Sequence, residues 1–180
     1  MSAGALLEIQ CLNILPDGRK FIIDLDISIN KPLEMLNSEL IGTYCAIDER
    51  FQKVALVLKS WNRGISPNKN NRLNSFSIYL LLLAFMLDQK YMINLQKLAP
   101  NKQIMEVKVH TDSSSTIKIR TEVQFLRDFD EIEQVCEDKR LLGQLRHFNK
   151  TPADILVAFL RFYRWSFHMG YHVAHVGSGR

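Results

Sequence analysis

The chain has 180 residues, of which 47% are hydrophobic and 23% charged, and its formal net charge is +4. This composition excludes a disordered, collagen-like or fibrous protein, and the length predicts a soluble globular protein of one domain or slightly more. The mild positive charge is compatible with a nucleic acid or polyphosphate ligand but does not require one.

The first predicted element is a pair of strands, residues 5–15 and 19–29, around the turn Pro16-Asp17-Gly18. Proline presets φ and glycine accepts a positive φ, which suits a tight turn. Polar and apolar residues alternate along the second strand, so Asp24 and Asp26 share one face with Lys20. The opposite face is apolar and consists of Phe21, Ile23, Leu25, Ile27 and Ile29.

Three helices are predicted next. The first begins near Pro32, with Asn30 as its N-cap, and the second covers residues 48–62 and ends at Gly64. After a polar loop, Asn74 or Ser75 caps a third helix that contains the apolar run 78–87. These ten residues are about half of what a membrane-spanning helix needs, so we expect a buried core helix and no membrane span. The buried stripe of the second helix is expected to be Phe51, Val54, Ala55, Leu58 and Trp61.

The second half of the chain predicts a hairpin over residues 104–109 and 117–123, then a helix over 130–147. Thr151, Pro152 and Asp154 resemble a capping box that opens a last helix, through about Phe167. Taken together, these elements predict an α+β fold, in which a short antiparallel sheet from the N-terminal strands joins a mostly helical domain.

The cysteines indicate the compartment. Cys11, Cys45 and Cys136 are widely spaced and form no CxxC pair, which argues against a disulfide framework or a cysteine zinc site. The N-terminus lacks the features of a secretory signal. We therefore expect a cytoplasmic protein, with the mitochondrion and the nucleus as open alternatives.

Four blocks of the sequence, in this order, resemble template-independent RNA nucleotidyltransferases, that is, terminal uridylyltransferases and cytoplasmic-type poly(A) polymerases. The blocks are residues 23–48 (IDLDISINKPLEMLNSELIGTYCAID), 51–62 (FQKVALVLKSWN), 72–83 (RLNSFSIYLLLL) and 151–167 (TPADILVAFLRFYRWSF). The first is similar to the strand with the third catalytic carboxylate and the helix after it. The others are similar to the family's LVLLVKxWAK helix, its TLSSYxxxLM segment and its ELLxxFFRYY helix. Residues 91–100 also resemble its PNLQ turn.

The resemblance implies a DNA-polymerase-β-like nucleotidyltransferase architecture. Residues 1–30 would be the C-terminal strands of the catalytic sheet, in part. Residues 31–176 would be the helical central domain with the poly(A)-polymerase-associated region, and 177–180 a flexible tail.

Asp26 matches the family's third catalytic carboxylate. The resemblance implies that it binds Mg²⁺ or Mn²⁺ and activates the RNA 3′-hydroxyl, in a reaction whose two metal ions need several converging carboxylates. Asp24 and Asp26 have the spacing of the family's Asp-x-Asp pair, but that pair follows a Gly-Ser turn and a helix, whereas here a strand and a Pro-Asp-Gly turn precede them. The family's first two carboxylates are therefore expected upstream of residue 1. Without the resemblance, Asp26 would be an exposed strand aspartate.

Lys59, Arg63 and Ser75 match the family's triphosphate-binding residues. Lys59 and Arg63 are one helical turn apart and can project from one face, although the family has a second lysine where this chain has Arg63. The hydroxyl of Ser75 would meet the triphosphate beside free backbone N–H groups. The alternatives are two solvated charges at a helix end and a capping serine.

The remaining nucleotide contacts implied by the resemblance are to the base and the ribose. Phe76 matches a tyrosine that stacks on the base, and phenylalanine keeps the aromatic face while losing the hydroxyl. Asn37, with Ser38 beside it, matches residues that contact the ribose hydroxyls. The alternatives are core packing for Phe76 and a polar helix surface for Asn37.

Two groups of basic residues lie in the second half of the chain. Lys108, His110, Lys118 and Arg120 share one face of the predicted hairpin and could follow an RNA backbone, although a solvated face is favoured slightly. His168, His172 and His175 suggest a metal site, but Gly170 interrupts a helix there and no acidic or cysteine partner is near. For these histidines we favour a structural or exposed role.

The sequence thus supports two functions. The first is an RNA 3′-end nucleotidyltransferase that adds UMP or AMP from a nucleoside triphosphate, in a chain that begins inside the catalytic sheet and needs a further segment or a second chain to complete it. The second is a non-catalytic relative or subunit of the same fold that binds protein or RNA. A third hypothesis, less favoured than these two, is a related enzyme for small or double-stranded RNA-linked substrates.

Overall fold

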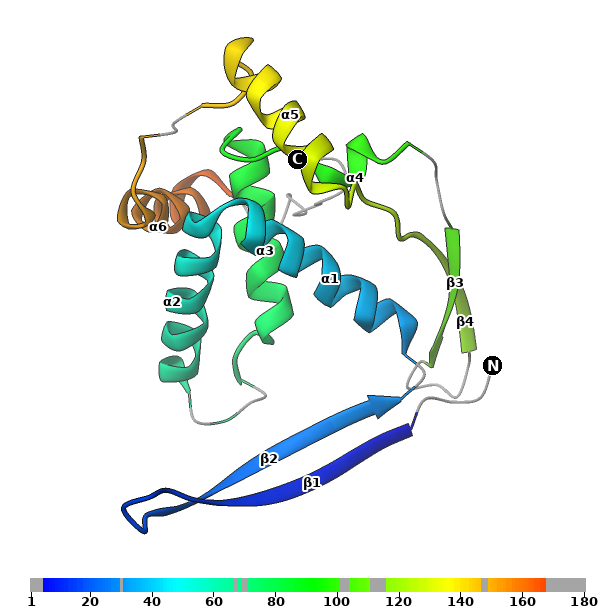
Figure 1. Cartoon of the computed structure of the whole chain (residues 1–180), viewed down its shortest axis with the longest axis vertical. Helices are drawn as coiled ribbons and strands as arrows, with labels where there is room; N and C mark the ends of the chain where they lie inside the picture. The colour runs from blue at the N-terminus through cyan, green and yellow to red at the C-terminus, as the bar shows by residue number, and fades with distance from the viewer. Residues whose placement is uncertain are drawn as a thin grey trace. The chain divides into compact units, whose positions relative to one another are not determined.

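The computed structural model describes residues 5–29, 31–66, 68, 71–100, 104–110, 116–146 and 149–167. The chain divides into two compact units, Met1–Ser38 and Glu39–Arg180, each of which is described here by itself. The structure combines helices with two antiparallel hairpins (Figure 1), which confirms the predicted α+β class.

The first unit contains the antiparallel hairpin of β1 (Ala5–Ile14) and β2 (Lys20–Ile29). Leu15 and Arg19 close the predicted turn through a 2.9 Å hydrogen bond from the Leu15 N–H to the Arg19 carbonyl. Gly18 has a φ of +82°, the left-handed conformation that glycine adopts at little cost. Helix α1 (Pro32–Ile47) follows with Pro32 in its first turn, while the predicted cap Asn30 lies outside the described residues.

Helix α2 (Glu49–Ile65) is capped by Asp48, whose carboxylate accepts from the Arg50 N–H and pairs with the Arg50 guanidinium at 2.7 Å. Two predictions for this helix are wrong. It continues past Gly64 to Ile65, and Trp61 is 57% exposed. The buried position belongs to Asn62, because Phe51, Ala55, Leu58 and Asn62 recur at the helical spacing of one face.

Helix α3 (Ser75–Asp88) is the predicted core helix. Asn74 caps it by accepting from the Ser77 N–H at 2.7 Å, and Leu82, Leu83 and Met86 have no exposed surface. It packs against α2. Within the described residues, no helix has the length and apolar character to cross a membrane.

The short helix α4 (Leu95–Leu98) is tied to α1 across 51 residues of sequence. The Leu95 N–H donates to the Tyr44 hydroxyl at 3.0 Å, and the Tyr44 ring is fully buried. Burial raises the pKa of Tyr44 well above its usual range, because the phenolate would lose its hydration. This contact fixes the turn that begins the short helix.

Strands β3 (Ile104–His110) and β4 (Thr116–Glu122) form the second hairpin, as predicted. Helix α5 (Phe129–Leu141) is shorter than the predicted helix over 130–147. Gly143 has a φ of +64° and its N–H bonds to the Arg140 carbonyl, an arrangement that ends a helix. The chain after it turns Leu145 into the core.

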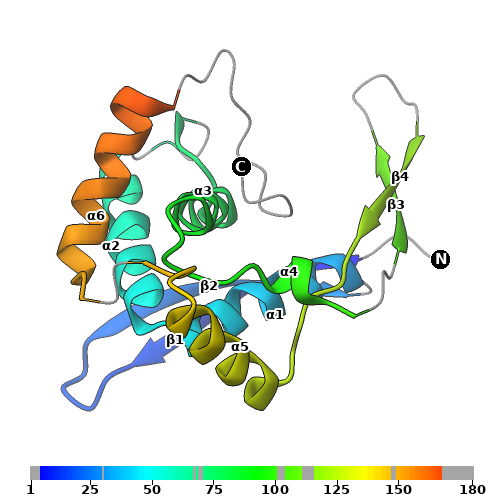
Figure 2. The same cartoon turned by 90° about the horizontal axis from the view of Figure 1, so that it is seen from above.

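Helix α6 (Pro152–Arg161) packs beside α2 (Figure 2) and begins with the predicted capping box. The Asp154 N–H donates to the Thr151 hydroxyl, and the Asp154 carboxylate accepts from the Thr151 N–H at 2.9 Å. The predicted helix to Phe167 does not continue as a regular α-helix. Its last turn is a π-helix, η2 (Phe162–Ser166), closed by the Phe167 N–H to the Phe162 carbonyl.

We expect Thr151→Ala to lower the free energy of unfolding by about 1 kcal/mol, since it removes the side chain that caps the Asp154 N–H. Urea denaturation of the full chain measures this loss. Thr151→Ser retains the hydroxyl and serves as the control. Equal losses in the two variants would show that the capping hydrogen bond does not stabilise the helix.

Candidate functional site

The end of α2 and the start of α3 lie at the same end of the helical unit (Figure 1). The side-chain amide of Asn62 donates to the Leu73 carbonyl at 2.7 Å, two residues before α3 begins. Asn62 is only 5% exposed, so this hydrogen bond is largely shielded from water. The contact therefore holds the chain before Ser75 against the helix that carries Lys59 and Arg63.

Arg72 adds a second tie between the same elements. Its guanidinium donates to the Arg63 carbonyl at 3.4 Å and to the Ser66 carbonyl at 3.5 Å. The sequence reasoning gave no role to either Asn62 or Arg72. The sequence could have indicated Asn62, because it stands at the helical spacing of the buried residues, where a polar side chain needs a hydrogen-bond partner.

The N-terminus of α3 has free donors. The Asn74 side chain satisfies the Ser77 N–H, whereas no residue in the described parts of the chain accepts from the N–H groups of Ser75 and Phe76. The first turn of a helix carries a partial positive charge. Backbone donors in that position are suited to an anionic group such as a phosphate.

Lys59 and Arg63 are cations in the last two turns of α2, the helix that Asn62 ties to the chain before α3. Lys59 is half-buried and Arg63 is exposed, and neither forms an ion pair with any residue that the structure describes. Both cations are therefore available to a ligand. Phe76 is half-buried and packs against the core, which agrees in part with the core-packing alternative for this residue.

Asp26 lies in the first unit, exposed on β2, with Glu8 of β1 as its Cα partner. Asp24 lies on the same face of the hairpin and accepts from the Gln10 side chain at 2.9 Å. Among the residues that can be described, no three His, Cys, Asp or Glu side chains form a group that could hold a metal ion. Because Mg²⁺ needs several oxygen ligands, the described carboxylates do not fit a two-metal site by themselves.

Asn37 and Ser38 also lie in the first unit, on α1. The Ser38 hydroxyl donates to the Glu34 carbonyl at 2.9 Å, one turn back in its own helix, and Asn37 is half-buried. The predicted residues thus form two groups: Lys59, Arg63, Ser75 and Phe76 in the second unit, and Asp26, Asn37 and Ser38 in the first.

The register of the second hairpin pairs Lys108 with Lys118 and Glu106 with Arg120. The side chains of Lys108, His110, Lys118 and Arg120 lie outside the part of the structure that can be described. So do His168, His172 and His175. The RNA-binding role considered for this hairpin stays a prediction.

Comparisons with known proteins point to one kind of relative. The chain is 24% identical to the poly(A) RNA polymerase GLD2-B of Xenopus laevis over 149 residues, which are 80% of this chain and 25% of that protein. It is 26% identical to the poly(A) RNA polymerase GLD2 of Mus musculus and 25% identical to that of Homo sapiens, each over 92 residues, or 49% of this chain and 19% of the relative.

The chain thus spans about a quarter or less of the length of these curated relatives. No protein-family model matches it. No solved structure matches it significantly. The resemblance to RNA nucleotidyltransferases in the four sequence blocks is nevertheless confirmed at the level of the family, because the relatives found are poly(A) RNA polymerases.

Proposed function

We propose that this chain is the nucleotide-binding part of an RNA 3′-end nucleotidyltransferase. The observation that carries the proposal is the part-buried hydrogen bond from the buried Asn62 side chain to the Leu73 carbonyl, which holds the start of α3 against the end of α2. Lys59 and Arg63 supply cations there, and Ser75 supplies a hydroxyl and a free N–H group. This set of donors matches the charge and the many acceptor oxygens of a triphosphate.

The other residues complete the nucleotide contacts in this proposal. The ring of Phe76 stacks on the base, and the ribose contacts that the resemblance implies for Asn37 and Ser38, which lie in the first unit, stay a prediction. The names of the relatives favour ATP over UTP as the substrate, and RNA as the acceptor. Asp26 contributes one carboxylate to a Mg²⁺ or Mn²⁺ site whose other ligands come from protein outside the described residues.

The test is ATP binding to the full chain by isothermal titration calorimetry. We expect the double variant Lys59→Ala/Arg63→Ala to weaken ATP binding at least about tenfold, since each charged contact to phosphate is worth on the order of 1 kcal/mol or more. Lys53→Ala is the matched control, because Lys53 is an exposed cation of the same helix that pairs with Glu49 at 2.7 Å.

Two results would overturn the nucleotide site. One is the absence of ATP binding to the unsubstituted chain, and the other is an equal effect of the double variant and of Lys53→Ala. Titrations with ADP and AMP by the same method extend the test, since the affinity should fall as phosphates are removed.

The second candidate is a non-catalytic relative that binds RNA or protein. The observation in its favour is the lack of a metal-binding carboxylate group among the described residues. Extension of a single-stranded RNA in the presence of Mg²⁺ and ATP separates the candidates. Extension that is lost in Asp26→Ala supports the transferase, and ATP binding without extension supports the non-catalytic relative.

A further inference from the structure

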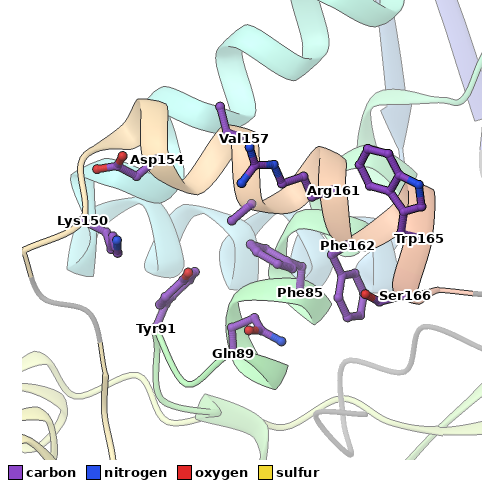
Figure 3. A pocket seen from close by; sticks show the side chains of 11 residues that line it. Phe85, Gln89, Tyr91, Lys150, Asp154, Val157, Arg161, Phe162, Trp165 and Ser166 are labelled. Atoms are coloured by element: carbon purple, nitrogen blue, oxygen red, sulfur yellow. The ribbon is translucent and has the colours of Figure 1, made fainter.

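A cavity of about 610 Å³ lies beside α6, away from the residues assigned to ATP. One wall is formed by α6 and η2, and the other by the end of α3 and by Tyr91. Figure 3 shows Lys150 and Asp154 at one end, Trp165 and Ser166 at the other, and Arg161 between them. Its volume lies within the range of ligand-binding cavities. The cavity is thus elongated, with polar and aromatic groups at separate places along it.

The π-helical turn sets the aromatic end of the cavity. The Tyr163 hydroxyl donates to the Leu81 carbonyl at 2.9 Å, and this bond anchors the turn to α3. Trp165 and Ser166 then line the cavity in continuation of the α6 residues. Single π-helical turns occur often at functional sites, where they reposition side chains that a regular helix would direct elsewhere.

Trp165 offers an open aromatic surface. It is 63% exposed, and the Arg164 guanidinium lies 4.6 Å from a ring centroid of its indole. No aromatic ring among the described residues packs on the indole. An exposed indole held beside a cation is a suitable platform for stacking a nucleobase.

The charged residues lie along the cavity, with Lys150 and Asp154 at one end and Arg161 between that end and Trp165 (Figure 3). Lys150 and Arg161 have no hydrogen-bond or ion-pair partner within the described ranges. Asp154, at the same end as Lys150, uses one carboxylate oxygen for Thr151, and its other oxygen receives no hydrogen bond from a described residue. The hydrogen bonds from Thr151 and the charge of Lys150 hold the pKa of Asp154 below its usual range, so it is an ionised acceptor at neutral pH.

This order of groups matches a single strand of RNA. A base on Trp165 would place its phosphate toward Arg161. The next nucleotide would reach the far end of the cavity, where its ribose can meet Asp154 and its phosphate can meet Lys150. A ribose 2′-hydroxyl can donate to a carboxylate, whereas an acidic peptide would bring further carboxylates against Asp154. The chemistry therefore favours RNA over an acidic peptide.

We propose that the cavity beside α6 binds about two consecutive nucleotides of single-stranded RNA, with one base stacked on Trp165 and the backbone along Arg161, Asp154 and Lys150. This site shares no residue with the proposed ATP site, so it does not depend on that assignment. It gives the chain a contact with the RNA strand at a place separate from the nucleotide.

The two tryptophans of the chain allow a direct test. Trp61 is 57% exposed, so Trp61→Phe should be tolerated and leaves Trp165 as the sole indole. In that background, a hexamer of adenosine RNA should quench the fluorescence of Trp165. Trp165→Phe retains only Trp61 and serves as the control for quenching at the other indole.

Three comparisons decide the outcome. Arg161→Gln should weaken RNA binding about tenfold, while Lys53→Gln, which removes an equal charge outside the cavity, should not. The DNA hexamer should bind several-fold more weakly than RNA, because it lacks the 2′-hydroxyl. AMP alone should quench much less than the hexamer at equal concentration.

The proposal is overturned if RNA does not quench Trp165, or if Arg161→Gln and Lys53→Gln have equal effects. It is also overturned if AMP binds as tightly as the hexamer, which would make this a mononucleotide site, or if a glutamate-rich peptide binds in place of RNA. Because this experiment follows only the fluorescence of Trp165, a lack of RNA binding here is distinguishable from a lack of ATP binding at Lys59 and Arg63.

Discussion

Phe85→Ala is expected to lower the free energy of unfolding by about 3–5 kcal/mol, a large part of the stability of a domain of this size. Phe85 is 2% exposed and contacts three other aromatic rings. Its ring centroid lies 5.8 Å from Tyr91, 5.7 Å from Phe159 and 5.4 Å from Phe162. The ring therefore joins α3 to α6 and to the π-helical turn, and alanine would leave a void among all of them.

Urea denaturation of the full chain measures the effect as a lower midpoint with an unchanged slope. Phe85→Leu is the control, because leucine keeps most of the apolar volume and should cost clearly less than alanine. A loss below about 1 kcal/mol for Phe85→Ala would show that the surrounding rings close over the void, since residual cavity volume sets much of the cost.

Asn62→Asp should destabilise the chain by about 2–4 kcal/mol at neutral pH, and the effect should shrink in acid. The amide of Asn62 donates to the Leu73 carbonyl, whereas an ionised carboxylate at this buried position would face that carbonyl with no proton. Burial should raise the pKa of the introduced carboxyl group above its unfolded value of about 3.9. The protonated carboxyl group can donate to the Leu73 carbonyl. The stability of the variant relative to the unsubstituted chain is therefore retained below the unfolded pKa of about 3.9 and lost as the pH rises through the folded pKa.

The measurement is the difference in unfolding free energy between Asn62→Asp and the unsubstituted chain at pH 4 and at pH 7. Asn62→Ala removes the same hydrogen bond without a titratable group, so its deficit should be nearly independent of pH. A deficit for Asn62→Asp that is the same at both values would contradict the buried hydrogen bond.

The same variants test the proposed ATP site. Asn62→Ala should weaken ATP binding about tenfold, because the start of α3 loses its hydrogen bond to α2. Ser60→Ala, at an exposed position of α2, should leave the affinity unchanged. Unchanged ATP affinity in Asn62→Ala would mean that this contact does not position the phosphate donors.

Local sequence signals predicted local structure well. The turn around Gly18, the Asn74 cap and the Thr151 capping box all depend on hydrogen bonds between residues that are two to four positions apart. The same local reasoning failed where two signals competed. Gly64 does not end α2, which continues to Ile65 with Ser66 as its C-cap. The left-handed Gly143 follows the end of α5, so this helix is shorter than its apolar pattern predicted.

The candidate site was predicted only in part. The resemblance named Lys59, Arg63, Ser75 and Phe76 as one group, and all four lie in the second unit, on α2 and α3, while their roles stay predictions. The resemblance did not name Asn62, since the role of this buried amide depends on its hydrogen bond to a residue eleven positions away. Nor did it indicate the cavity beside α6, whose lining comes from two separate segments of the chain, residues 85–91 and 150–166.

By itself, the sequence determined the fold class, the turn around Gly18, the caps at Asn74 and Thr151, and the resemblance to RNA nucleotidyltransferases, because periodicity, capping chemistry and residue blocks act over short stretches of chain. Only the tertiary structure decided which polar groups are buried, how Tyr44 fixes Leu95 and Tyr163 fixes Leu81, and where Trp165 lies. Such contacts join residues 51 and 82 positions apart, and their stability comes from the packing around them rather than from any local pattern.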